Sequence, residues 1–201
     1  MKRILWMAVL VFALPVAAFA NSDRIDFNFV GGTLTGSASG LNLSGSEFSM
    51  VDGLNSGGML AGNLGSITLT TGSLSSGSIS CARNGKCGTF SGGTFVITGN
   101  GSNGLPGGVL FSGTLSDLTW THDKVAKANL YILTGNLDGT WYNGTGGGGG
   151  IVLVVQALPN GSFTVLNGYG FTTTVPEPGT LGLMGTGLIG VAGLLRRKLR
   201  S

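Results

Sequence analysis

Between Asn21 and Val175, hydrophobic residues recur at every second position of the chain. The alternating sets are Ile25, Phe27 and Phe29; Ile67 and Leu69; Phe95 and Ile97; Leu118 and Trp120; Tyr131, Leu133, Leu137 and Trp141; and Phe163, Val165, Tyr169 and Phe171. A period of two, rich in aromatic and β-branched residues and separated by glycine-rich turns, predicts strands with one buried face. No window carries a helical stripe, and Asp123 to Asn129 would make one turn at most. The fold class is therefore all-β.

The architecture is predicted less sharply, as a single β-sandwich or a barrel-like roll. The body has about 155 residues, enough for one domain with a hydrophobic core. Residues 151–155 are apolar without interruption, which is typical of a central strand covered on both faces and favours the sandwich. The five glycines before them, Gly146 to Gly150, suggest a flexible loop rather than a phosphate cradle, because neither a lysine nor a helix follows.

The N-terminus has the three-part layout of a secretory signal peptide. Lys2 and Arg3 precede an apolar run, and small residues end at Ala20. Signal peptidase accepts small side chains of this kind, so we expect cleavage between Ala20 and Asn21. The body that follows is then an exported protein.

The C-terminus combines a short apolar segment with a basic cluster. Gly179 to Leu195 is 17 uncharged residues, about 25 Å as a helix against a hydrocarbon core of about 30 Å. We expect a marginal transmembrane helix. The bases Arg196, Arg197, Lys198 and Arg200 should stay on the cytoplasmic side. Pro176 and Pro178 exclude a helix just before it and favour an extended, protease-accessible stretch.

This arrangement resembles a known sorting signal. The motif Val175, Pro176, Glu177 and Pro178, then an apolar helix, then a terminal basic cluster, is similar to the PEP-CTERM signal of exported bacterial proteins. The resemblance is confined to residues 175–201. It implies recognition by an exosortase, a membrane cysteine transpeptidase that cuts near the motif, and an association with the envelope and exopolysaccharide. A permanent tail anchor is the alternative.

Three segments follow: a signal peptide over 1–20, a Gly/Ser/Thr-rich all-β domain over 21–174 and the sorting signal over 175–201. The formal net charge of +3 belongs to the two ends, because the body holds five bases and seven acids. A body with a net charge of −2 gives no support to nucleic-acid binding. The expected partners are signal peptidase, the exosortase, exopolysaccharide and, transiently, the inner membrane, with the cell surface or extracellular matrix as destination.

Two cysteines, Cys81 and Cys87, flank Arg83-Asn84-Gly85, which would suit a three-residue hairpin loop with glycine in the left-handed position. Such a hairpin would place the cysteines opposite each other and close enough to bridge. An even cysteine count in an exported chain agrees with a structural disulfide. A metal site and a redox pair are the alternatives, but further ligands and tight spacing are missing.

Catalytic residues do not assemble in the sequence. His122 precedes Asp123, but neighbours in a strand point to opposite faces. Asp117 and Asp138 are the acid pair that glycoside hydrolysis would need, but base rates favour solvated turn carboxylates. His122 is expected at the surface or at a strand end. We therefore expect no enzyme activity, no cofactor and no metal.

Aromatic residues supply one binding hypothesis. Trp120, Trp141 and Tyr142 lie near polar groups and are candidate carbohydrate contacts, whereas the alternative places the tryptophans in the core. The leading interpretation is an exported structural protein of the cell surface or exopolysaccharide matrix. A carbohydrate-binding module or adhesin is the second, and a polysaccharide-degrading enzyme is remote.

Overall fold

The computed structural model describes residues 24–54, 57–81, 84–125 and 128–174. These residues form eleven β-strands and no α-helix, so the all-β prediction is confirmed. The strands are β1 (Arg24–Val30), β2 (Thr33–Ser37), β3 (Gly40–Asp52), β4 (Leu60–Thr71), β5 (Leu74–Gly77), β6 (Gly85–Phe90), β7 (Gly93–Asn100), β8 (Gly107–Val125), β9 (Ala128–Trp141), β10 (Gly146–Ala157) and β11 (Phe163–Thr174).

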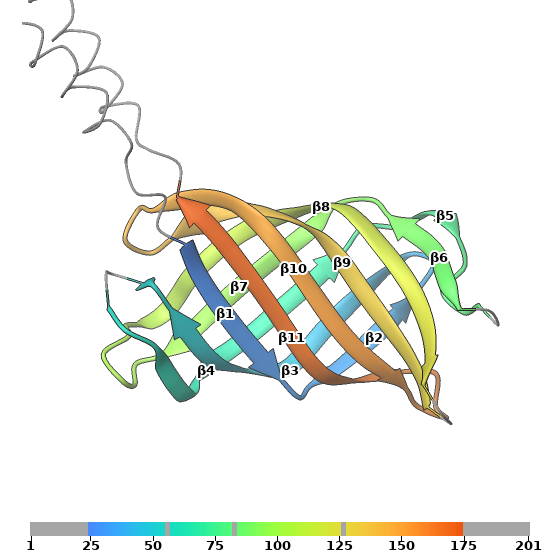
Figure 1. The fold of residues 1–201 in the computed structure, drawn as a ribbon, viewed down its shortest axis with the longest axis horizontal. Helices are drawn as coiled ribbons and strands as arrows, with labels where there is room; N and C mark the ends of the chain where they lie inside the picture. The colour runs from blue at the N-terminus through green and yellow to red at the C-terminus, as the bar shows by residue number, and fades with distance from the viewer. Residues whose placement is uncertain (1–23, 55–56, 82–83, 126–127, 175–201) are drawn as a thin grey trace, which may run out of the picture. The chain divides into compact units, whose positions relative to one another are not determined.

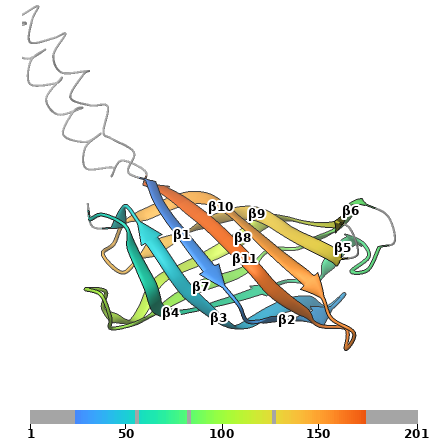
Figure 2. The same cartoon turned by 60° about the horizontal axis from the view of Figure 1, so that its bottom comes forward.

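The sheet closes on itself into a barrel (Figure 1). Neighbours run β8-β7-β4-β3-β1-β11-β10-β9, and β9 pairs with β8 again, so eight strands complete the ring. Every pairing among the described strands is antiparallel. The first and last strands lie side by side, with Arg24 opposite Thr173 (Figure 2). Closure removes the open edges at which a sheet would otherwise pair with another chain.

At three of the eight positions around the barrel, two successive short strands lie end to end in place of one long strand. Along β11, the partner changes from β1, where Phe29 faces Gly168, to β2, where Leu34 faces Phe163. Along β8, the partner changes from β7 at Leu115 to β6 at Leu118. β4 and β5 share the third such position: β4 pairs with β7, and β5 pairs with β6. The chain therefore follows an up-and-down course around one barrel.

The barrel interior is filled by side chains. Its largest fully buried members are Trp120, Phe27, Phe29, Phe48, Phe95 and Phe111. The rings contact one another in tilted and edge-on pairs, such as Phe27 with Phe95 at 5.6 Å between ring centres. An eight-stranded barrel is just wide enough for side chains to fill. The alternation of the sequence is thus the alternation between a packed interior and a solvated outer wall.

The sandwich interpretation of residues 151–155 is wrong, and the barrel alternative holds. Ile151, Leu153 and Val155 point inward and are at most 2% exposed, whereas Val152 is 37% exposed on the outer wall. A β-branched residue suits a pleated strand on either face. An uninterrupted apolar run therefore did not require two covered faces.

The glycine run is not a loop. Gly146 to Gly150 form the first half of β10; Gly147 to Gly150 pair on both sides, with β9 and with β11, and Gly146 pairs with β9. Glycine has no side chain, but its backbone N–H and C=O complete a ladder like those of any other residue. Two fixed neighbouring strands hold this segment extended despite its intrinsic flexibility.

A bulge in β11 reverses which side chains face out. Val165 pairs with Val155, but Asn167 pairs with Val154, so Leu166 is an extra residue. Beyond it, Gly168 and Gly170 point into the barrel, and Tyr169 and Phe171 point outward. The sequence had placed both aromatics on the parity of Phe163 and Val165. One inserted residue shifts the pairing register of the strand by one position, and this moves every later side chain to the other face of the sheet.

The terminal segments predicted as signal peptide and transmembrane helix lie outside the described residues, so both stay predictions. The described part of the chain contains no helix of a length and hydropathy that would span a bilayer. The segment boundaries at 20 and 174 are likewise untested.

Candidate functional site

The two tryptophans proposed as carbohydrate contacts belong to the core. Trp120 is 0% and Trp141 is 2% exposed. The Trp120 indole donates to the Ile79 carbonyl at 2.9 Å and stacks on Tyr131. The Trp141 indole donates to the Thr172 hydroxyl at 3.0 Å. Both indole N–H groups are satisfied inside the barrel, so neither ring is presented to an external sugar.

Tyr142 differs from the tryptophans because it follows the end of β9. Its side chain is 41% exposed, and its backbone N–H donates to the Leu110 carbonyl at 2.7 Å. It remains a candidate contact by exposure alone. The structure does not bring it together with the tryptophans into one surface.

The three residues considered for catalysis lie on opposite sides of the barrel wall. His122 is buried at 4% exposure, against the expectation of a surface residue, and its ring lies 4.8 Å from that of Tyr131. Asp117 and Asp138 are exposed on the outer wall. The strand β8 places His122 on the inward parity of Leu118 and Trp120, which the dipeptide with Asp123 did not reveal. This histidine is separated by the wall from both acids.

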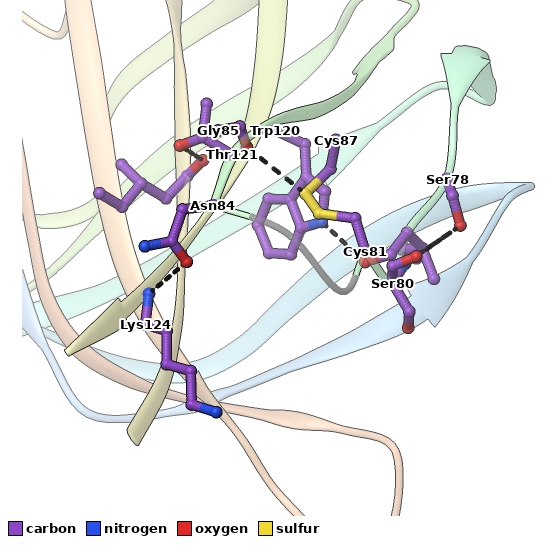
Figure 3. Close-up of a disulfide and its surroundings, with 11 residues drawn as sticks. Ser78, Ser80, Cys81, Asn84, Gly85, Cys87, Trp120, Thr121 and Lys124 are labelled. Atoms are coloured by element: carbon purple, nitrogen blue, oxygen red, sulfur yellow. Dashed lines mark hydrogen bonds between the residues drawn. A yellow bond between two sulfur atoms is a disulfide. The ribbon is translucent and has the colours of Figure 1, made fainter. Parts of the chain in front are cut away.

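The predicted disulfide is present. Cys81 and Cys87 are bonded with their Cα atoms 5.7 Å apart. The expected hairpin is not the observed one, because Cys81 lies outside the strands and β6 pairs with β5 instead. The disulfide closes a loop at one end of the barrel, beside the indole of Trp120 (Figure 3). Cys81 and the nearby Ile79 are partly buried and pack against the core, so the disulfide ties this segment to β6.

A hollow opens on the outer wall where β8, β9, β10 and β11 run side by side. Its volume is about 380 Å³, and it is lined by Asp117, Thr134, Gly135, Asn136, Gly149, Gly150, Ile151, Val152, Tyr169 and Phe171. One row of paired residues crosses it, from Phe171 through Gly150 and Asn136 to Ser116. Gly150 has no side chain in that row. The space between the aromatic ring and the amide therefore stays open.

The two ends of this row differ in chemistry. On one side, the centres of the Tyr169 and Phe171 rings lie 6.4 Å apart. On the other, the Asn136 amide donates to the Asp117 carboxylate at 2.8 Å. This hydrogen bond occupies one of the two amide hydrogens of Asn136 and one of the two carboxylate oxygens of Asp117, so both groups can form further hydrogen bonds. The hollow thus has an apolar wall facing a polar one, and its described lining residues include one acid and no base.

The salt-bridged pair Arg24 and Asp26 contacts both aromatic residues of the hollow. Arg24 forms a salt bridge with Asp26 at 2.8 Å, and its guanidinium lies 4.3 Å from the centre of the Phe171 ring. The Tyr169 hydroxyl accepts from Arg24 and donates to Asp26. Hydrogen bonds to Asp26 and Tyr169 raise the pKa of the Arg24 guanidinium. Loss of solvent, and then the bond to Asp26, raise the pKa of the Tyr169 phenol.

A second hollow adjoins the first across Asp117. It has a volume of about 510 Å³ and is lined by Ser75, Lys86, Thr89, Phe90, Ser91, Gly92, Ser116, Asp117, Leu118 and Thr119. Asp117 sits at the bulge of β8 with φ of 51°, an uncommon conformation for a residue other than glycine. That bulge marks the point where β8 exchanges its partner β7 for β6. Asp117 therefore contributes to both hollows.

Sequence reasoning missed the aromatic wall of the hollow, Tyr169 and Phe171. One signal was present, because Gly168 and Gly170 alternate with them. A Cβ atom at either glycine would collide with the ring of Phe29 or Phe27. Glycines at every second position opposite two buried phenylalanines indicate the inward face, and so place the aromatics between them outside.

Comparison with known proteins supplies one match, at the C-terminal end. Residues 174–198 match the family model of the PEP-CTERM protein-sorting motif. The chain carries a PEP-CTERM sorting motif. Neither a curated protein nor a solved structure matches the chain significantly. The PEP-CTERM motif confirms the resemblance drawn from the tail and is confined to that segment. It indicates an exported protein that an exosortase sorts and processes at the membrane.

The PEP-CTERM match includes the residues that carried the prediction. Val175, Pro176, Glu177 and Pro178 open it, and the bases up to Lys198 close it, with Arg200 just beyond. These residues, like the cleavage site at Ala20 and Asn21, lie outside the described part of the structure. Their individual roles in processing therefore stay predictions.

Proposed function

We propose that the barrel is a non-enzymatic structural protein of the cell surface or exopolysaccharide matrix. The observation that supports this function most is the closed barrel with a side-chain-filled interior. Such a fold offers a stiff body without open sheet edges. Its wall carries hydroxyl pairs between strands, such as Thr70 with Thr94 at 2.7 Å. A hydrated wall with few charges suits a protein that shares space with polysaccharide.

A non-catalytic role is favoured by where the ionisable groups lie. General acid–base chemistry needs both partners within reach of one substrate. His122 is inside the barrel, whereas Asp117 and Asp138 are outside it. Among the described residues, no group of three or more His, Cys, Asp or Glu side chains is arranged to hold a metal ion. A glycosidase or esterase activity that disappeared with Asp117→Asn or Asp138→Asn would contradict the proposal.

The sorting step is tested in the producing cell. Glu177→Ala or Pro176→Ala should leave uncut protein in the membrane fraction, because the motif that the exosortase recognises is altered. Neutral substitutions throughout the basic cluster should let the tail pass through and shed unprocessed protein. Recovery of peptides ending at Ser201 from the mature surface protein, in cells with a working exosortase, would support a permanent tail anchor instead.

The structural role itself is tested by deletion. Cells that lack this chain should form a matrix with a lower elastic modulus, and the processed protein should fractionate with that matrix in wild-type cells. An unchanged modulus together with recovery of the protein only in the medium would refute the matrix role. The sorting result would stand in either case.

A second candidate function is a carbohydrate-binding module or adhesin. The tryptophans no longer support it, because they are buried. The outer hollow supports it instead, since an aromatic wall opposite an amide–carboxylate pair is the composition expected of a small-ligand site.

A further inference from the structure

We propose that the two outer hollows form one binding strip for a neutral polysaccharide chain, centred on Asp117 and Asn136. The proposal rests on the barrel being exported, and it does not require the structural role in the matrix.

The two hollows adjoin at one residue. Asp117 lines both, and the paired row Phe171, Gly150 and Asn136 of the first hollow continues to Ser116 of the second. The lining residues extend from β11 to β5, which is five strand intervals, or about 24 Å along the wall at the usual strand spacing. This length suits a chain of linked units better than one isolated small molecule.

The chemistry of the strip changes along its length. At the β11 end, Tyr169 and Phe171 offer apolar ring surface. In the centre, Asn136 and Asp117 offer an amide and a carboxylate joined by a 2.8 Å bond. Toward the other end, Ser75 of β5, Thr89 of β6 and Thr119 of β8 carry hydroxyls, and the Ser75 and Thr89 hydroxyls lie 3.0 Å apart. A sugar ring presents both C–H faces and hydroxyls, so it can use the apolar wall and the polar groups together.

The charges select a neutral chain. Among the described residues, those that line the first hollow include one acid, Asp117, and no base, and Arg24 beside the Phe171 ring is already paired with Asp26. The described residues of the second hollow include one base, Lys86, together with Asp117. A polyanion would be repelled by the Asp117 carboxylate at the centre of the strip, whose hydrogen-bond partner, the Asn136 amide, is neutral. Nucleic acids and acidic polysaccharides are therefore disfavoured by the same residue that would accept sugar hydroxyls.

Gly150 keeps the first hollow open, and it has a matched control on its own strand. A Cβ at Gly150 would lie 3.2 Å from the Phe171 ring and project into the hollow. Gly148, the next outward position of β10, lines neither hollow, and a Cβ there would meet nothing within 4 Å. Neither glycine has a positive φ, so both positions accept a side chain without backbone strain.

The test is affinity electrophoresis of the processed protein, purified from the producing cells. Native gels contain dextran, soluble mixed-linkage β-glucan, the neutral polysaccharide fraction of the producer's matrix, or alginate as an anionic probe. We expect at least one neutral polymer to retard the wild-type protein. Gly150→Thr and Asn136→Ala should weaken that retardation about tenfold, as the loss of one net hydrogen bond or of the space for a ring would do. Gly148→Thr should match the wild type.

Several results would overturn the proposal. They are no retardation by any neutral polymer, retardation by alginate alone, and equal weakening by Gly148→Thr and Gly150→Thr. Near-ultraviolet circular dichroism of each variant reports whether the barrel is intact, and Asn136→Ala tests the strip without adding volume. None of these results bears on sorting, which the membrane fractionation tests separately.

Discussion

Substitution of Gly170 by alanine should destabilise the barrel, although alanine is normally the better residue in a strand. Gly170 has no positive φ, so relief of backbone entropy alone would stabilise the protein by about 0.5–1 kcal/mol. The added Cβ, however, would lie more than 1 Å inside the 3.4 Å at which ordinary contact with the Phe27 ring begins. The sign of the effect depends on whether that ring can move.

The packing around Phe27 indicates that it cannot move without cost. The ring is 0% exposed and contacts Phe95 at 5.6 Å and Trp141 at 6.1 Å between ring centres. Overpacking of a filled core costs about 1–3 kcal/mol and sometimes more. The clash therefore outweighs the entropic gain, and we expect a net loss of about 1–2 kcal/mol for Gly170→Ala.

Phe27→Leu in the same chain should restore part of this loss. The smaller side chain costs about 1–2 kcal/mol alone, between the costs of Ile→Val and Phe→Ala. It also removes the ring atoms that meet the new Cβ. The double variant should then show a favourable coupling of about 1–3 kcal/mol, within the range for residues in direct contact.

The assay is urea unfolding of the processed protein, followed by the fluorescence of the buried tryptophans. Gly148→Ala is the matched control, since its Cβ meets nothing within 4 Å, and the entropic term alone should raise its stability by about 0.5–1 kcal/mol. Wild-type stability for Gly170→Ala would refute the inward placement of this glycine. Strictly additive effects of Gly170→Ala and Phe27→Leu would refute the contact with Phe27.

Three further predictions concern separate parts of the barrel. The double substitution of Cys81 and Cys87 by serine should lower stability by about 2 kcal/mol, because the closed loop is short, yet leave a folded barrel; mass spectrometry should find the wild-type thiols oxidised. The pKa of the Tyr169 phenol is higher in the folded protein than in the unfolded chain, so its stabilising contribution is complete below about pH 10 and declines as pH rises through the folded-state pKa. The difference in unfolding free energy between wild type and Tyr169→Phe, measured by urea titration, should therefore shrink at alkaline pH. Trp141→Phe should cost about 2–4 kcal/mol, since it leaves a void and removes the donor to the buried Thr172 hydroxyl, and the further change Thr172→Val should recover about 1 kcal/mol.

The sequence alone determined the features that depend on local order. The Pro-Glu-Pro turn, the short apolar run and the basic cluster follow one another in the tail, and the family comparison confirms that motif. The period of two between Ile25 and Val165 determined strands with one buried face, because side-chain direction alternates within any strand whatever its partner. The pairing of Cys81 with Cys87 also followed, since only two cysteines are present.

Only the tertiary structure decided which face each later residue occupies. The extra residue Leu166 in β11 turned Tyr169 and Phe171 outward. The alternating Gly168 and Gly170 signal the change of face, but they do not mark Leu166 as the extra residue. It becomes extra only against β10, where Val154 and Val155 set the register. The outer hollow likewise needs Gly150 between Phe171 and Asn136, three residues that the register of β9, β10 and β11 brings into one row. Periodicity is a property of one strand, whereas register and closure are properties of pairs. The wall that could bind a ligand was therefore decided by pairing across the barrel and not by the alternation along it.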